Sequence, residues 1–147
     1  MEIGNLNQIL SSINEDYISE SHLVAEIYCR LRASISNTPK NDIFLEFPYS
    51  NNKRLKCDIY IEGDSKIWIE VKTYLKTETA STRSKKHTSP QSSPFKDCSK
   101  LEKLPNADYK FIVIYKNVKF KPKNNFSWDH LSKECEKQGI NLIYIDI

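Results

Sequence analysis

The sequence is poor in the residues that build several common kinds of functional site. Its three glycines form no Gly-rich phosphate-binding loop, and its three histidines stand at no catalytic or metal-ligand spacing. The four cysteines never form a Cys-x-x-Cys pair, so we expect them to be reduced and mostly buried. These absences disfavour a phosphate loop, a structural zinc site and histidine-centred hydrolysis.

Long apolar runs are also missing. No run approaches the roughly 20 residues that cross a bilayer, and residues 1–10 lack the basic start and apolar centre of a secretory signal. The chain has 147 residues, of which 39% are hydrophobic and 28% charged. This composition predicts a single globular domain over residues 1–147, located in the cytoplasm and without membrane contact.

Charge is divided unevenly along the chain. Residues 1–50 carry three basic and seven acidic side chains, whereas the remainder carries nineteen basic and twelve acidic ones. The excess of positive charge in the second part is a weak indication of a polyanionic partner.

Hydrophobic spacing predicts an α/β domain with a mixed central sheet. The first forty residues have helical periodicity, strongest at Leu23, Val24, Ile27 and Leu31, with Ser19 or Ser21 as the cap. Three strands follow, at about 43–47, 55–62 and 66–74. After them we predict a mobile basic loop at about 77–94, a helix over 94–104, a strand over 111–115, a helix between Ser127 and Gly139, and a strand over 141–147. The predicted order is αβββαβαβ.

The second and third strands carry the most informative pattern. In the third, Ile67, Ile69 and Val71 share one face, while Trp68, Glu70 and Lys72 share the other. In the second, the same alternation places Cys57, Ile59 and Ile61 opposite to Asp58, Tyr60 and Glu62. A three-residue loop at 63–65 would pair Tyr60 with Trp68 and Asp58 with Glu70.

Two carboxylates directly opposite each other repel, and a divalent cation would offset this repulsion. Mg²⁺ commonly uses one or two carboxylates together with water and a substrate phosphate. Lys72 would lie on the same face, within reach of that phosphate. An ordinary surface ion pair among Asp58, Glu70 and Lys72 is the competing interpretation.

Asp58, eleven intervening residues and then Glu70-Val71-Lys72, in this order of elements, resemble the PD-(D/E)xK nuclease superfamily. Cys57 stands where the name of the motif has proline. The resemblance implies a restriction-endonuclease-like fold and hydrolysis of a nucleic-acid phosphodiester. It also implies Mg²⁺, with Mn²⁺ as an alternative, held by Asp58, Glu70 and the Val71 carbonyl.

The superfamily usually adds a glutamate from its first helix. Glu20 and Glu26 are the candidates, and helix geometry places Glu20 near the middle of the apolar face and Glu26 more than about 100° from its centre. We therefore favour Glu20 as the catalytic or metal-binding carboxylate. Its competing interpretation is a charge that complements the helix dipole.

Basic residues near the motif are candidates for contacts with phosphates. Lys100 lies in an Asp97-Cys98-Ser99-Lys100-Leu101 stretch that is similar to nucleases of this superfamily. The other candidates are Arg54, Lys56, Arg83, Lys85 and Lys86. Trp128 and the tyrosines are not interleaved with basic residues, so we expect them to serve packing.

The resulting functional hypothesis is a metal-dependent nuclease, with an endonuclease preferred, acting in defence, restriction or repair. DNA is the commoner substrate of the superfamily, and sequence preference would come from loops, a homodimer or a partner protein. A non-catalytic nucleic-acid-binding module and a regulatory subunit are the alternatives.

Overall fold

The computed structural model describes residues 3–13, 19–35, 42–50, 52–74, 93–102, 104, 106–117 and 128–147. Its elements, in chain order, are α1 (Ile3–Ser11), α2 (Glu20–Ile35), β1 (Asp42–Pro48), β2 (Lys56–Glu62), β3 (Ile67–Tyr74), α4 (Ser93–Glu102), β4 (Tyr109–Lys116), α5 (Trp128–Lys137) and β5 (Asn141–Asp146). Within this part of the chain, no helix is long and apolar enough to cross a membrane.

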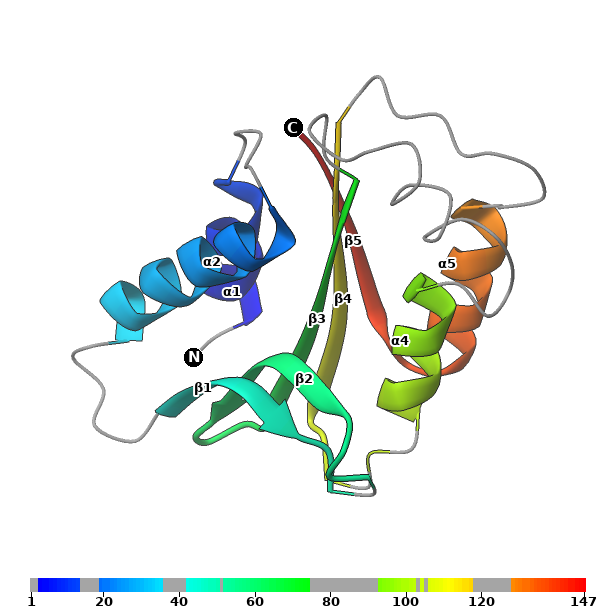
Figure 1. Cartoon of the computed structure of the whole chain (residues 1–147), viewed down its shortest axis with the longest axis horizontal. Helices are drawn as coiled ribbons and strands as arrows, with labels where there is room; N and C mark the ends of the chain where they lie inside the picture. Colours follow the sequence, from blue (N-terminus) through cyan, green and yellow to red (C-terminus); the bar gives the residue numbers. More distant parts are fainter. Residues whose placement is uncertain are drawn as a thin grey trace.

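The elements form three layers, with the sheet between two layers of helices. Helices α1 and α2 cover one face of the sheet, and α4 and α5 cover the other (Figure 1). The five strands follow the order β1-β2-β3-β4-β5, with the first two pairings antiparallel and the last two parallel. The predicted α/β class and mixed sheet are therefore confirmed, and β3 lies at the centre, where antiparallel pairing changes to parallel.

Each face of the sheet has its own hydrophobic core. Isoleucines and valines of β2, β3 and β4 pack with α1 and α2 on one side, where Leu23, Ile27 and Leu31 are fully buried. The other side is more aromatic and joins Tyr60, Trp68 and the α4 and α5 residues around Leu101 and Leu131. Because both faces are covered, all eight residues of β3 are buried.

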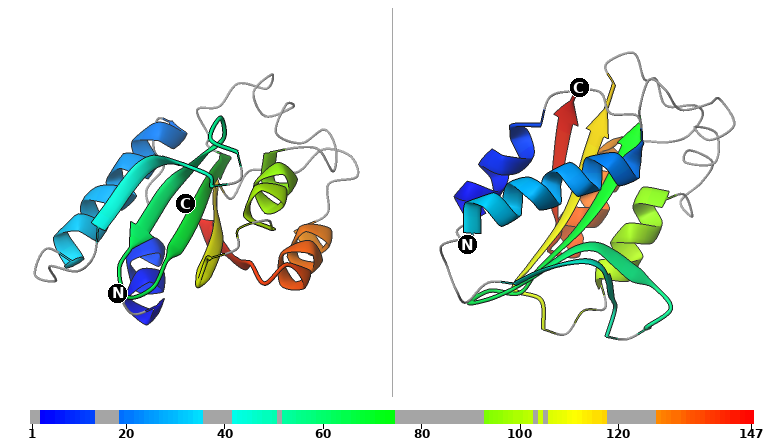
Figure 2. Two further views of the ribbon diagram at one scale, coloured as in Figure 1. Left: turned by 90° about the horizontal axis from the view of Figure 1, so that it is seen from below. Right: turned by 60° about the vertical axis from the view of Figure 1, so that its left-hand side comes forward.

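The N-terminal helical region is divided, which corrects the predicted order. Among the described residues it contains two helices, so the order of the described elements is ααβββαβαβ. Ser19 caps α2, since its hydroxyl accepts a hydrogen bond from the His22 N–H at 3.2 Å. Helix α2 crosses the sheet in front of β3 and β4 (Figure 2), and this crossing brings its first residue, Glu20, close to β3.

The predicted facing of β2 and β3 is right except at Cys57. The pairing of Tyr60 with Trp68 confirms the predicted register, and Asp58 and Glu70 fall on its extension. Cys57, however, belongs to the aromatic core and not to that of Ile59 and Ile61. The alternation of β2 side chains is interrupted opposite Glu46 of β1. Glu46 has a φ of 48°, and the β1–β2 pairing is broken there, between Leu45 and Phe47.

The later boundaries differ slightly from the prediction. Helix α4 starts at Ser93, inside the predicted loop of 77–94, and the remainder of that loop lies outside the described residues. The predicted cap Ser127 also lies outside them. Gly139 ends α5 as predicted, with a φ of 67°. The Ile140 N–H bonds the Cys135 carbonyl, which completes the helix end.

Candidate active site

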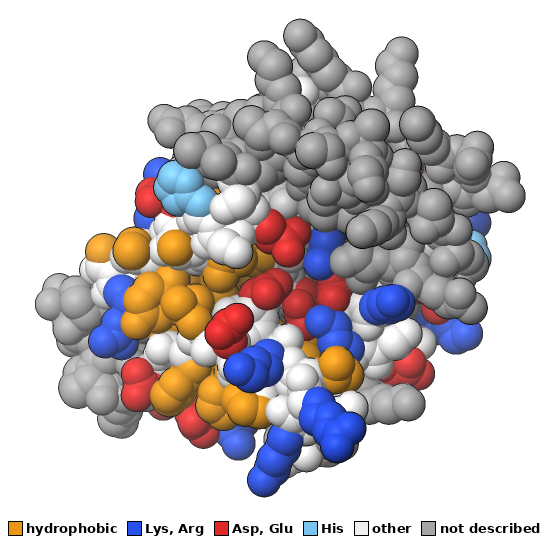
Figure 3. Space-filling model, viewed as in Figure 1, with side chains coloured by type: hydrophobic (Ala, Val, Ile, Leu, Met, Phe, Trp, Pro, Cys, Tyr) orange, Lys and Arg blue, Asp and Glu red, His pale blue; other side chains and the backbone are white. Residues whose placement is uncertain are grey.

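The candidate active site lies on the α4 side of β3 and extends to the start of α2. Strand β3 contributes Glu70 and Lys72, β2 contributes Asp58, and α2 contributes Glu20. Helix α4 adds Asp97 and Lys100, which lie on the same face of that helix, one turn apart. Figure 3 shows acidic side chains gathered on this face of the molecule, with Lys and Arg side chains beside them.

Asp58 and Glu70 are adjacent, as the sequence predicts. Asp58 Oδ2 accepts a hydrogen bond of 2.7 Å from the Val71 N–H, and Glu70 is within hydrogen-bonding reach of Asp58. Burial raises the pKa of both carboxyls, and in Glu70 the neighbouring Asp97 and Asp58 raise it further. The predicted Val71 carbonyl ligand stays a prediction, since the contact seen here is made by the Val71 N–H.

Glu70 is held from two directions. It is only 2% exposed. Lys100 Nζ lies 2.9 Å from Glu70 Oε1, and the Tyr49 hydroxyl donates a hydrogen bond to the same oxygen. Burial raises the pKa of Tyr49 above its ordinary range, so the phenol remains a donor at neutral pH. The Glu70 carboxylate therefore has a defined orientation.

Lys72 stays charged although it is buried. Burial by itself would lower the pKa of Lys72, but the carboxylates around it, first Asp97 and then Glu20, raise the pKa above its ordinary value. Lys72 Nζ lies 3.3 Å from Asp97 Oδ2 and 3.8 Å from Glu20 Oε1. A lysine in this state can stabilise negative charge, whereas it is a poor proton acceptor.

Asp97 links the two lysines. Asp97 is 3% exposed, with Oδ1 2.8 Å from Lys100 Nζ and Oδ2 3.3 Å from Lys72 Nζ. The sequence motif indicated Lys100 in this stretch but not Asp97. A signal was present, since Asp97 stands four and seven positions before Leu101 and Leu104 and so shares their buried face.

Glu20 lies at the edge of the site. Glu20 Oε2 accepts from the Thr73 N–H at 3.0 Å and from the Thr73 hydroxyl at 3.1 Å, while Oε1 faces Lys72. Glu26 instead pairs with Arg30 at 2.8 Å, four residues further along α2. Of the two glutamates, the structure thus places Glu20 beside the motif.

The remaining predicted contacts divide into two groups. Arg54 and Lys56 are exposed at the β1–β2 turn, and no described contact brings them to Asp58 or Glu70. Arg83, Lys85 and Lys86 lie outside the described residues. Tyr49 is the residue that sequence reasoning missed without any usable signal, because nothing local distinguishes it from a packing tyrosine.

Charge and donor chemistry allow a divalent cation at this site. Glu20, Asp58, Glu70 and Asp97 would carry four negative charges when ionised, against two positive charges on Lys72 and Lys100. Among the described residues, no three His, Cys, Asp or Glu side chains converge into a metal cage. Mg²⁺ needs only one or two carboxylates when water and substrate fill the other positions, so Asp58 and Glu70 fit this ion.

Two comparisons with known proteins give no match. No protein-family model matches the chain, and no curated protein matches it. The function proposed below therefore rests on the geometry of the site.

Proposed function

We propose that this protein is a Mg²⁺-dependent nuclease of the PD-(D/E)xK type that hydrolyses phosphodiester bonds, with DNA as the preferred substrate class. The observation that carries the proposal is the adjacency of Asp58 and Glu70 beside the buried, charged Lys72. Structural ion pairs are usually exposed, whereas a buried group with excess negative charge and raised carboxyl pKa values is typical of a functional site.

Each residue has a role that follows from its position. Asp58 and Glu70 would hold the ion, which supplies a water of lowered pKa and offsets phosphate charge. Lys72 would stabilise the negative charge that develops on the phosphate, because the carboxylates around it keep it protonated. Glu20 orients Lys72 through Oε1 while Thr73 fixes Oε2. Asp97 and Lys100 position Lys72 and Glu70 from the side of α4.

The test is a cleavage assay with single-stranded, double-stranded and branched DNA and with RNA, in Mg²⁺, Mn²⁺ or EDTA. We expect Lys72→Ala to lower the cleavage rate by about 10²–10³-fold and Glu70→Ala to abolish metal-dependent cutting. Lys137→Ala and Glu136→Ala are matched controls, since both residues are exposed on α5. Circular dichroism and thermal unfolding verify that each variant is folded.

Two results would contradict the proposal. Full cleavage by folded Lys72→Ala would remove the role assigned to Lys72. The absence of cutting of any substrate by the wild-type protein, together with nucleic-acid binding that EDTA does not change, would favour a non-catalytic binding module.

A further inference from the structure

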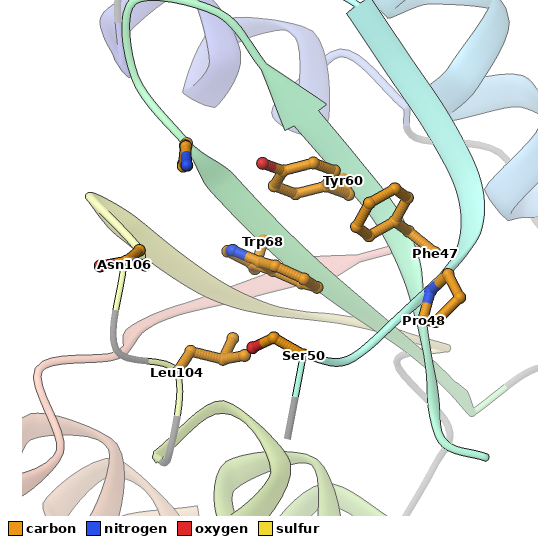
Figure 4. A pocket seen from close by; sticks show the side chains of 8 residues that line it. Phe47, Pro48, Ser50, Tyr60, Trp68, Leu104 and Asn106 are labelled. Atoms are coloured by element: carbon orange, nitrogen blue, oxygen red, sulfur yellow. The ribbon is translucent and has the colours of Figure 1, made fainter. Parts of the chain in front are cut away.

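An aromatic pocket adjoins the candidate active site. It has a volume of about 210 Å³ and lies where β1, β2 and β3 meet the segment before β4 (Figure 4). Its interior is formed by Phe47, Tyr60, Trp68 and Leu104, and its rim includes Ser50 and Asn106. Neither the nuclease motif nor the proposed mechanism uses this pocket.

The interior of the pocket is aromatic and apolar. The ring centroids of Tyr60 and Trp68 are 4.4 Å apart, and those of Phe47 and Tyr60 are 4.3 Å apart. Tyr60 and Trp68 are only 4% and 6% exposed, so these rings are fixed by packing. The faces of Trp68 are covered by Tyr49 and Tyr60, so the pocket offers ring edges and the half-buried Phe47. Such a fixed aromatic lining favours a planar ring as the occupant, because aromatic rings pack well edge to face.

The rim of the pocket is polar. Ser50 and Asn106 are exposed, and together they offer a hydroxyl and an amide that can donate and accept hydrogen bonds. Lys66 also lines the pocket and adds a positive charge. An aromatic interior with hydrogen bonding at the rim matches a nucleobase, which has an apolar face, polar edges and an attached phosphate.

Tyr49 connects the pocket to the catalytic carboxylates. Its ring stacks on Trp68 with centroids 5.3 Å apart and an interplanar angle of 12°, and its hydroxyl donates to Glu70. Trp68 also precedes Glu70 by two positions on the same face of β3, a separation of roughly 7 Å. About two base steps of DNA cover this length, so one strand can occupy both places.

We propose that the aromatic pocket binds one unpaired nucleobase next to the phosphate that is cleaved. This inference rests on the proposed nuclease function and specifies its substrate as a strand that is single or locally opened. A paired base cannot enter, because its edge is occupied by the opposite strand and its faces by neighbouring bases. The pocket thereby makes the site selective for unpaired nucleotides.

The test measures binding without cleavage. In EDTA, fluorescence anisotropy compares a labelled single strand of about 12 nucleotides with its duplex. Ser50→Trp fills the mouth of the pocket, and Lys53→Trp places the same side chain on the same turn outside it. We expect the wild-type protein to prefer the single strand, Ser50→Trp to lose about tenfold in affinity, and Lys53→Trp to change less than about twofold.

Asn106→Trp obstructs the rim from the segment before β4. It provides a second measurement of single-strand affinity if Ser50→Trp does not fold. Equal single-strand affinity for the obstructing variants and Lys53→Trp, or a wild-type preference for the duplex, would overturn the pocket. Cleavage in Mg²⁺ is measured separately. If the wild type cuts DNA but all variants bind the single strand equally, the pocket proposal is refuted and the nuclease proposal stands. If the obstructing variants alone lose single-strand binding but the wild type cuts no substrate, the nuclease proposal is refuted and the pocket remains a nucleobase site.

Discussion

At the scale of single residues, the carboxyls of the site are held in a state that costs stability. Burial raises the pKa of Asp58 despite the hydrogen bond from Val71, and it raises that of Glu70 despite Lys100 and Tyr49. A carboxyl with a raised pKa opposes folding when it is ionised. Such a cost is expected where charges are gathered to bind a cation.

The first prediction concerns Asp58→Asn. Between the unfolded-state pKa of Asp58, 3.8, and its higher folded-state pKa, the folded state binds more protons, so the free energy of unfolding falls as pH rises through this window. Asparagine keeps the acceptor for Val71 and removes the charge. We expect the variant to melt at a higher temperature than the wild type in EDTA near about pH 7, with the difference decreasing as pH falls toward 3.8.

Thermal unfolding followed by circular dichroism across this pH range measures the effect. Asp64→Asn serves as the control, because Asp64 is exposed in the β2–β3 loop. A wild-type protein that is more stable than Asp58→Asn at neutral pH would contradict the assigned cost of ionised Asp58.

The second prediction concerns Lys100→Met, which removes the cation between Glu70 and Asp97. Burial alone would lower the pKa of Lys100, but Asp97 and Glu70 raise it, so the ammonium group balances two buried carboxylates. We expect a loss of roughly 3 kcal/mol in the free energy of unfolding, the low end for breaking a buried pair, since Lys100 is partly exposed. Urea unfolding measures it, and exposed Lys96→Met on the same helix is expected to remain within about 0.5 kcal/mol. Equal losses in the two variants would refute the role of Lys100.

At the scale of elements, the ends and crossings of helices decide which side chains reach β3. Helix α2 starts at Glu20 because Ser19 caps it, and the crossing of α2 over the sheet brings this first residue to Thr73 and Lys72. Helix α4 packs against β3 and β4 and presents Asp97 and Lys100. The site therefore depends on side chains from four elements, β2, β3, α2 and α4.

The third prediction tests an element boundary. Gly139 has a φ of 67° at the end of α5, a conformation that is strained for residues with a Cβ. Gly139→Ala should lower the free energy of unfolding by about 1 kcal/mol. Gly4→Ala is the matched control, because Gly4 lies in α1 with open space around it and should gain helix propensity without strain. Denaturant unfolding compares the two variants, and destabilisation by Gly4→Ala alone would contradict this assignment.

At the scale of the whole molecule, the proposed metal couples the site to the stability of the fold. A ligand that binds only the folded state raises stability, by about 2.7 kcal/mol at one hundred times its dissociation constant. We expect Mg²⁺ to raise the unfolding temperature of the wild type and of Asp64→Asn, but not of Asp58→Asn. An identical shift in all three proteins would locate the ion elsewhere, and no shift in the wild type would argue against Mg²⁺ binding.

Local sequence determined the parts of this protein that depend on period-two alternation and on short turns. It correctly places Ile67, Ile69 and Val71 opposite to Glu70 and Lys72, and the three-residue loop pairs Tyr60 with Trp68. Both results follow from neighbours along the chain, where the pleat leaves little choice. The same reasoning fails at Cys57, because the break at Glu46 arises on a different strand.

Tertiary structure alone decided the surroundings of the motif. Tyr49 lies directly after β1, and the course of the chain there brings its hydroxyl to Glu70. Asp97 contacts Lys72 because α4, which follows β3, packs back against the sheet. Helical periodicity could select Glu20 over Glu26, but it could not show that Thr73 would hold its carboxylate. These contacts join segments that are distant in sequence, and their formation depends on the packing of whole helices against the sheet, which local periodicity does not encode.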